Sequence, residues 1–108
     1  MTVWRSFHRL REANALKRCA LVTEPIDIHA LIAAARHDAS GALGIFIGTV
    51  RNHSQGRRVE AIDYTAYEPM AEAVLHAIAQ ECSEQWPGVS LYCYHRLGRL
   101  VVGDDAVV

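Results

Sequence analysis

The feature that most constrains the fold is a long apolar stripe bounded by two prolines. Its residues recur every three or four positions, the period of one helix face: Ala71, Val74, Leu75, Ile78, Cys82 and Trp86. Pro69 stands where the first turn of a helix tolerates proline, and Pro87-Gly88 ends the pattern. The spacing predicts a helix over 69–86 that needs another layer to cover its apolar face.

A second, shorter helix is predicted from Asp27 to about His37. Asp27 suits the N-cap position, and Ser40-Gly41 supplies the break after the helix. Its apolar residues again share one face: Ile28, Leu31, Ile32 and Ala35.

The remaining segments have the apolar composition and alternation of strands. Strands are predicted over 20–23, 41–51, 58–67, 89–96, 100–102 and 106–108. The turn at 52–57 joins 41–51 to 58–67, which predicts an antiparallel hairpin. The order β-α-β-β-α-β-β predicts an α+β sandwich, mostly antiparallel, with helices packed on the sheet.

Glycines flank an aromatic residue in the apolar strand at 41–51. Gly44, Phe46, Gly48 and Val50 alternate onto one face, where two glycines leave a hollow. Glycine in a strand marks a close approach of backbone or ligand, or else a bulge or tight sheet packing. Both interpretations stay open at this point.

Length and charge restrict the kind of protein. The 108 residues suit one domain, and 51% of them are hydrophobic. Residues 1–18 carry +4, and we interpret them as an N-terminal extension, either a disordered artefact of the gene start or a surface helix; a targeting peptide is the third alternative. The body, residues 19–108, sums to −5, which argues against nucleic-acid binding. No apolar run reaches the ~18–20 residues needed to span a membrane.

Two clusters of polar residues are candidates for chemistry. Arg51, Asn52 and His53 precede Arg57 and Arg58 around one turn, which predicts either a phosphate site or a solvated basic hairpin. In the second cluster, alternation puts His95 on the apolar strand face and Arg96 on the other. Either a bulge brings both side chains into one site, or only Arg96 contacts the ligand and His95 supports it from the apolar face.

Cysteine usage and the histidine pattern predict neither a metal nor a redox centre. Cys19, Cys82 and Cys93 are too scattered for a zinc site or a redox pair, so we expect buried, reduced thiols in a cytoplasmic protein. The histidines lack metal-ligand spacing, and no metal is predicted.

The order of these motifs resembles one family, the catalytic (large) subunit of molybdopterin synthase, from about Leu21 to the end of the chain. The resemblance rests on the following residues: Gly41-Ala42, Phe46, Gly48, Val50-Arg51, Gly56, Val59, Tyr64, Tyr67, Met70-Ala71, Glu81, Trp86, His95-Arg96-Leu97-Gly98 and Gly103-Asp104.

The resemblance implies a sulfurtransferase of molybdenum-cofactor biosynthesis with an α/β hammerhead fold. Such a subunit forms a homodimer and, with two ubiquitin-like small subunits, a heterotetramer. The small subunit carries a C-terminal thiocarboxylate, and its sulfur passes to cyclic pyranopterin monophosphate. The family uses no metal or organic cofactor for this step.

The resemblance also assigns residues to the substrate pocket. It implies that Thr49, Val50, Arg51, His95 and Arg96 bind the substrate. Phe46, Gly48 and Met70 would support the pocket. The cyclic phosphate of the substrate explains the two arginines, because phosphate needs fixed cationic donors.

The sequence departs from the family where the family has its catalytic groups. The two catalytic lysines of the family follow the Gly-Asp turn, whereas the only lysine here is Lys17. Thr65 stands where the family often has glutamate. The chain stops on the apolar run 106–108, so we expect a truncated C-terminal part, no retained catalytic residue, weak substrate binding and slow sulfur transfer.

Two alternatives stay open. The chain is a non-catalytic relative that acts only as a partner-binding or dimerisation module, or it is an unrelated α+β protein that binds phosphate or RNA through the basic turn at 51–58.

Overall fold

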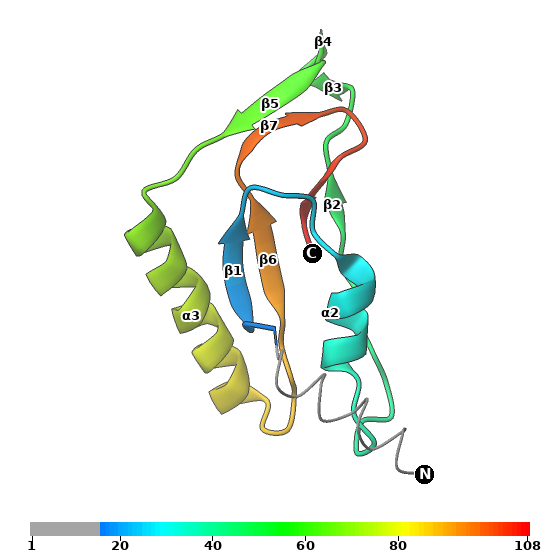
Figure 1. Ribbon diagram of the computed structural model, residues 1–108, viewed down its shortest axis with the longest axis vertical. Helices are drawn as coiled ribbons and strands as arrows, with labels where there is room; N and C mark the ends of the chain where they lie inside the picture. Colours follow the sequence, from blue (N-terminus) through cyan, green and yellow to red (C-terminus); the bar gives the residue numbers. More distant parts are fainter. Residues whose placement is uncertain (1–15) are drawn as a thin grey trace.

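The computed structural model describes residues 16–108 and contains a four-stranded mixed sheet at its centre. The strands follow the order β1 (Cys19–Val22), β6 (Cys93–Arg96), β8 (Asp105–Val107) and β2 (Gly48–Thr49). β1 runs parallel to β6, and the other two pairings are antiparallel. The predicted α+β class with a mostly antiparallel sheet is confirmed (Figure 1).

Two antiparallel ribbons extend beyond this sheet. β3 (His53–Ser54) pairs with β4 (Arg57–Arg58), and β5 (Ala61–Tyr64) pairs with β7 (Gly98–Val101). Both ribbons lie at the same end of the molecule, above the central sheet in Figure 1. Leu100 of β7 is fully buried there, together with Val50 and Ala106.

The long predicted helix is confirmed as α3 (Glu68–Gln85), with Pro69 in its first turn. It packs along β1, where the Cys19 thiol donates a hydrogen bond to the Leu75 carbonyl at 3.6 Å. Only part of its apolar stripe is covered. Half-buried residues recur at Ala71, Leu75, Ala79 and Cys82, whereas Met70, Val74, Ile78 and Trp86 are exposed.

The second predicted helix is confirmed as α2 (Ile28–Ala35), and Arg36 is its C-cap. Asp27 is its N-cap, because the Asp27 carboxylate accepts a hydrogen bond from the Ala30 amide at 3.0 Å. Leu31 is the buried residue of this helix. Neither helix of residues 16–108 is long and apolar enough to cross a membrane.

The strand predicted over 41–51 and its hairpin with 58–67 are wrong in extent and pairing. Only Gly48 and Thr49 join the sheet as β2, and their partner is β8. The segment 58–67 divides between β4 and β5, and β5 pairs with β7. The reason is geometric, since the three residues of β8 give no ladder partner to residues 41–47 within the described part of the chain.

Most of the extension predicted over 1–18 lies outside the described residues. At its end, Lys17 and Arg18 contact the central sheet. The Lys17 carbonyl accepts a hydrogen bond from the Tyr94 hydroxyl at 2.8 Å, and the Arg18 carbonyl accepts one from the Cys93 amide at 2.8 Å.

Candidate functional site

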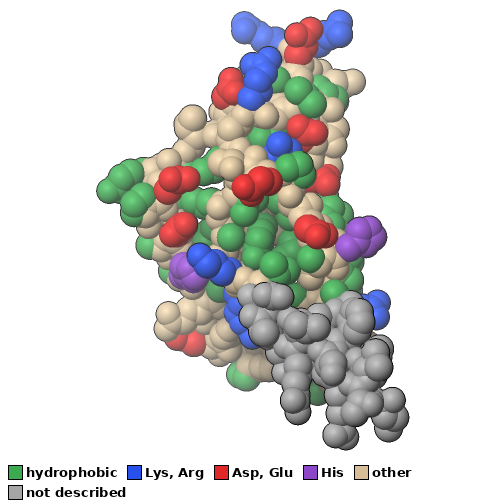
Figure 2. All heavy atoms as spheres, viewed as in Figure 1, with side chains coloured by type: hydrophobic (Ala, Val, Ile, Leu, Met, Phe, Trp, Pro, Cys, Tyr) green, Lys and Arg blue, Asp and Glu red, His purple; other side chains and the backbone are tan. Residues whose placement is uncertain are grey.

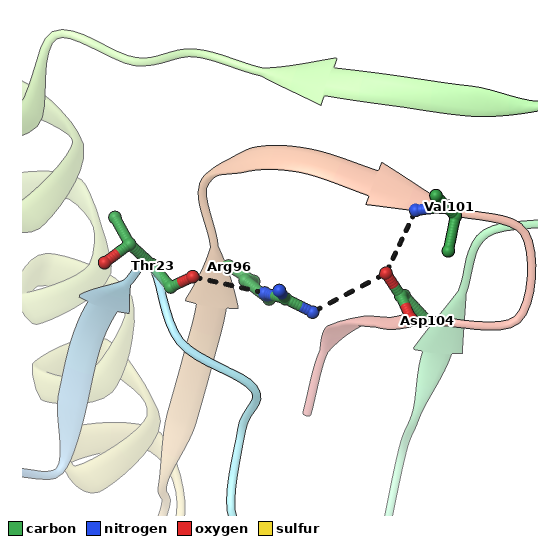
Figure 3. A network of polar contacts seen from close by, with 4 residues as sticks. All are labelled: Thr23, Arg96, Val101 and Asp104. Atoms are coloured by element: carbon green, nitrogen blue, oxygen red, sulfur yellow. Dashed lines mark hydrogen bonds and ion pairs between the residues drawn. The ribbon is translucent and has the colours of Figure 1, made fainter.

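Arg96 stands at the end of β6 and is held by acceptors from two other segments. Its Nε donates to the Thr23 carbonyl at 3.4 Å, and its guanidinium lies 3.7 Å from the Asp104 carboxylate (Figure 3). The same carboxylate oxygen accepts the Val101 amide at 3.0 Å. Because the Arg96 side chain is only 17% exposed, these contacts fix its direction at the sheet end.

Asp104 also contacts the strand that leads to Arg51. The Asp104 carbonyl accepts the Val50 amide at 2.9 Å, and the Gly103 amide donates to the Val50 carbonyl at 2.8 Å. Val50 is buried, with both backbone groups paired, and Arg51 follows it as an exposed residue. Asp104 therefore contacts Arg96 through its carboxylate and the residue before Arg51 through its carbonyl.

The role of Asp104 could not be read from the sequence. The Gly103-Asp104 turn was visible, but its contacts depend on β8 lying between β6 and β2. Gly103 adopts a φ of 92°, which glycine tolerates best. The turn thereby returns the chain beside Val50 and places the Asp104 carboxylate opposite Arg96.

His95 and Arg96 are consecutive residues of β6, so alternation along a strand puts their side chains on opposite faces of the sheet. Its Nδ1 lies 2.8 Å from the Arg96 carbonyl, which can only accept, so Nδ1 carries the proton in the neutral ring. The Tyr64 ring meets the imidazole edge-on, with centroids 5.0 Å apart. These contacts favour His95 as a support for the β6 end, with Nε2 left as an acceptor.

The space beside Gly48 is filled rather than hollow. A methyl group at Gly48 would lie 2.6 Å from the Val107 side chain and 3.5 Å from the Phe46 ring. Gly44 has open space around it. Tight sheet packing is therefore the correct one of the two interpretations of Gly48. Phe46 and Met70 are 72% and 62% exposed, and neither lines the pocket beside the β3–β4 hairpin.

An open pocket of about 690 Å³ lies beside the β3–β4 hairpin. Charged and polar side chains contribute to its lining beside apolar surface, and the lining residues are Asn52, His53, Gly56, Arg57, Arg58, Val59, Glu60 and Val102. Arg51, His95 and Arg96 do not line it. Figure 2 shows basic side chains at this end of the molecule, with acidic side chains beside them.

Two of the cysteines, Cys19 and Cys93, are poorly suited to act as nucleophiles. Cys19, Cys82 and Cys93 are all free thiols. Burial raises the pKa of the Cys19 and Cys93 thiols above the ordinary value, so both stay protonated at neutral pH. Residues 16–108 contain no group of three or more histidine, cysteine or carboxylate side chains that could hold a metal ion.

The fold and this sheet end define a mixed α+β domain with a candidate anion-binding site. The family model described as MoaE protein matches residues 21–108. The chain belongs to the MoaE family.

Curated relatives and solved structures agree with this assignment. The chain is 44% identical over 92 residues to the molybdopterin synthase catalytic subunit of Halalkalibacterium halodurans and 39% identical over 93 residues to that of Bacillus subtilis. These matches cover 85% and 86% of this chain, but only 59% of each relative. The chain thus spans about three-fifths of their length.

Two solved structures share the fold. Molybdopterin synthase from Staphylococcus aureus gives a TM-score of 0.80 at 37% identity, covering 85% of this chain and 67% of that one. The molybdopterin biosynthesis MoaE protein from Burkholderia ambifaria gives 0.72 at 33% identity, covering 84% and 60%.

Proposed function

We propose that this chain acts as the catalytic subunit of molybdopterin synthase in molybdenum-cofactor biosynthesis. It would receive sulfur from the thiocarboxylate of a ubiquitin-like small subunit and transfer it to cyclic pyranopterin monophosphate. The observation that carries the proposal is the family match over 21–108, with relatives of that name at 39–44% identity.

In this proposal Arg51 is the main phosphate ligand. Its side chain makes no hydrogen bond or ion pair with any residue of the described chain, so its five N–H donors are free for a phosphate. The paired backbone of Val50 holds the strand from which Arg51 projects. The exposed hydroxyl of Thr49, on β2, gives a further donor on the same strand.

Arg96 and His95 have different tasks in the proposal. Arg96 already lies beside the Asp104 carboxylate, so part of its charge is neutralised and its attraction for phosphate is weaker than that of Arg51. Its two fixed contacts preorganise the guanidinium edge that remains. His95 holds the β6 end through the Arg96 carbonyl and thereby positions Arg96.

The sulfur in this proposal arrives on the partner and not on a cysteine of this chain. The protonated thiols of Cys19 and Cys93 support that view, because the thiolate is the reactive form. In the transfer, a C–S bond forms to the pterin side chain as one of its C–O bonds breaks. Water then adds to the acyl carbon, and the acyl–sulfur bond breaks to leave the sulfur on the pterin and a carboxylate on the partner tail. A cation must stabilise the oxygen charge that develops.

The chain has only one lysine, Lys17, to serve as such a cation. We therefore expect residues 1–108 alone to bind the substrate and the small subunit but to transfer sulfur slowly. The test compares product formation by this chain with that by a chimera carrying the C-terminal segment of a full-length relative. We expect the chimera to turn over at least ~100-fold faster than residues 1–108 alone, because general acid catalysis usually contributes on this scale.

Turnover by residues 1–108 at the rate of the chimera would show that the lysines of the added segment are not needed. Binding of the small subunit without turnover by either protein would favour the alternative, a non-catalytic partner-binding or dimerisation module. The single lysine is the observation behind that alternative.

We also propose that the chain forms a homodimer within a heterotetramer and that it is located in the cytoplasm. The three free cysteines support this compartment.

A further inference from the structure

The β3–β4 hairpin concentrates the basic charge of an otherwise acidic body. Residues 19–108 contain six arginines, and three of them, Arg51, Arg57 and Arg58, fall within eight positions. The same ninety residues sum to −5. Such a separation of charge orients an approaching partner before contact.

The hairpin is built to hold these side chains away from the body. Gln55 and Gly56 form its two-residue turn with positive φ angles of 51° and 75°, the pattern of a type I′ turn. The ladder places His53 opposite Arg58 and Ser54 opposite Arg57. Since directly opposite residues share a face, the two arginines point to opposite faces of the ribbon.

The hairpin arginines also differ from other arginines in their partners. Arg96 and Arg99 each lie within 4 Å of a carboxylate, Asp104 and Asp63 respectively. The side chains of Arg57 and Arg58 make no ion pair or hydrogen bond with any residue between 16 and 108, and both residues are exposed. Their charge is therefore available to an outside group.

The shape of the region fits a protein surface better than a small ligand. The pocket beside the hairpin is open, whereas a small-molecule site buries most of its ligand. A nucleic acid is disfavoured by the acidic body, which would repel phosphates beyond the hairpin. A protein partner whose surface carries several carboxylates would be complementary in charge to the Arg57 and Arg58 side chains of the β3–β4 hairpin.

We propose that Arg57 and Arg58 form an electrostatic docking site for a carboxylate-rich surface of the small subunit. This inference rests on the proposed function, because it names the partner of the same reaction. It assigns the hairpin a role in the rate of encounter, while Arg51 serves the substrate. Exposed charges of this kind change association rates more than dissociation rates.

The test measures association of residues 1–108 with the purified small subunit of the same organism by stopped-flow fluorescence at 50 and 300 mM salt. We expect Arg57→Gln/Arg58→Gln to lower the association rate about 10-fold at low salt and to flatten its salt dependence. The matched control, Arg36→Gln/Arg99→Gln, removes the same charge from exposed sites outside the hairpin and should change the rate less than about 2-fold.

Equal effects of the two double variants would overturn the docking site and leave only a net-charge effect. An unchanged rate in the hairpin variant would overturn it as well. In both cases binding by the wild-type chain would preserve the proposed function. If the wild-type chain fails to bind the small subunit at all, the docking site and the proposed partner are both wrong. Circular dichroism of each variant checks that the fold is intact.

Discussion

At the scale of single residues, the sheet end depends on Gly48 having no side chain. β8 passes so close that the Val107 side chain occupies the space a methyl group on Gly48 would need. Val107 also faces His95 in the register of the sheet, so Gly48, Val107 and His95 lie in one row. Crowding at Gly48 would therefore disturb the strand that carries the candidate site.

We predict that Gly48→Ala lowers the free energy of unfolding by about 1–3 kcal/mol, the usual cost of overpacking. Chemical denaturation measures the loss. Gly44→Ala is the matched control, because nothing lies within 4 Å of the added methyl group, and it should change stability by less than about 0.5 kcal/mol.

A double variant identifies the cause. Gly48→Ala combined with Val107→Ala should be less destabilised than the sum of the single variants by about 0.5–2 kcal/mol, because the methyl group then finds room. Strict additivity would show that the Val107 contact is not the source of the cost.

The candidate residues were accessible from sequence to different degrees. Arg51, His95 and Arg96 could be named, and the facing of His95 followed from alternation. Asp104 could not be assigned a role, since its pairing with Arg96 joins two strands across the sheet. The hollow predicted beside Phe46 is filled at Gly48 by the Val107 side chain of β8. The pattern of one strand does not reveal which side chains of a neighbouring strand pack against it.

At the scale of elements, α3 has one broad apolar stripe, and only half of its width is covered within the described chain. Leu75 lies on the half-buried side against β1, whereas the adjacent Val74 is 52% exposed. Helical periodicity predicted the helix well, but it could not tell which half of a broad stripe a sheet covers.

We predict that Leu75→Ala destabilises the fold by about 1.5–3 kcal/mol, while Val74→Ala costs less than about 1 kcal/mol. Urea denaturation of both variants gives the comparison. A larger loss of unfolding free energy for Val74→Ala than for Leu75→Ala would mean that the exposed side of the stripe, and not the side facing β1, packs in solution.

The neighbouring strands β1 and β6 bury three groups in their neutral forms. Desolvation raises the pKa of Cys19 and Cys93 above 9.0 and that of Tyr94 above 10.0. The unfolded chain loses these protons at the ordinary values, so high pH favours unfolding. Their contribution is complete below about pH 8 and is lost as pH rises through the folded-state pKa values.

We therefore predict a falling free energy of unfolding between about pH 8 and pH 11, measured by urea titration at several pH values. Cys93→Ala should reduce the slope in this range, because one of the shifted groups is gone. A slope that is zero, or that Cys93→Ala leaves unchanged, would contradict this assignment.

Strand pairing was the least predictable aspect of the elements. The local pattern at 41–51 is typical of a strand, yet only Gly48 and Thr49 have ladder partners, because pairing depends on how far β8 extends. Ile45 and Phe46 are left more than half exposed. A hairpin predicted from adjacent segments also misses that β5 pairs with β7, far along the chain.

At the scale of the whole molecule, the basic groups gather where the sheet end and the two ribbons meet. Within residues 16–108 the Arg51 side chain has no partner, and Arg96 is held beside Asp104. The β3–β4 hairpin lies at the end of the molecule beyond the central sheet (Figure 1). Residues 19–108 sum to −5, so under the proposed function an anionic substrate would be drawn toward these arginines.

Isothermal titration calorimetry of residues 1–108 with cyclic pyranopterin monophosphate tests the central claim most directly. We predict that the wild-type chain binds and that Arg51→Gln weakens binding about 10- to 100-fold, the effect of losing a charged hydrogen-bond donor. Arg36→Gln, which removes the exposed arginine at the C-cap of α2, should leave the affinity unchanged. Equal affinities for the wild type and Arg51→Gln, or no binding by the wild type, would contradict it.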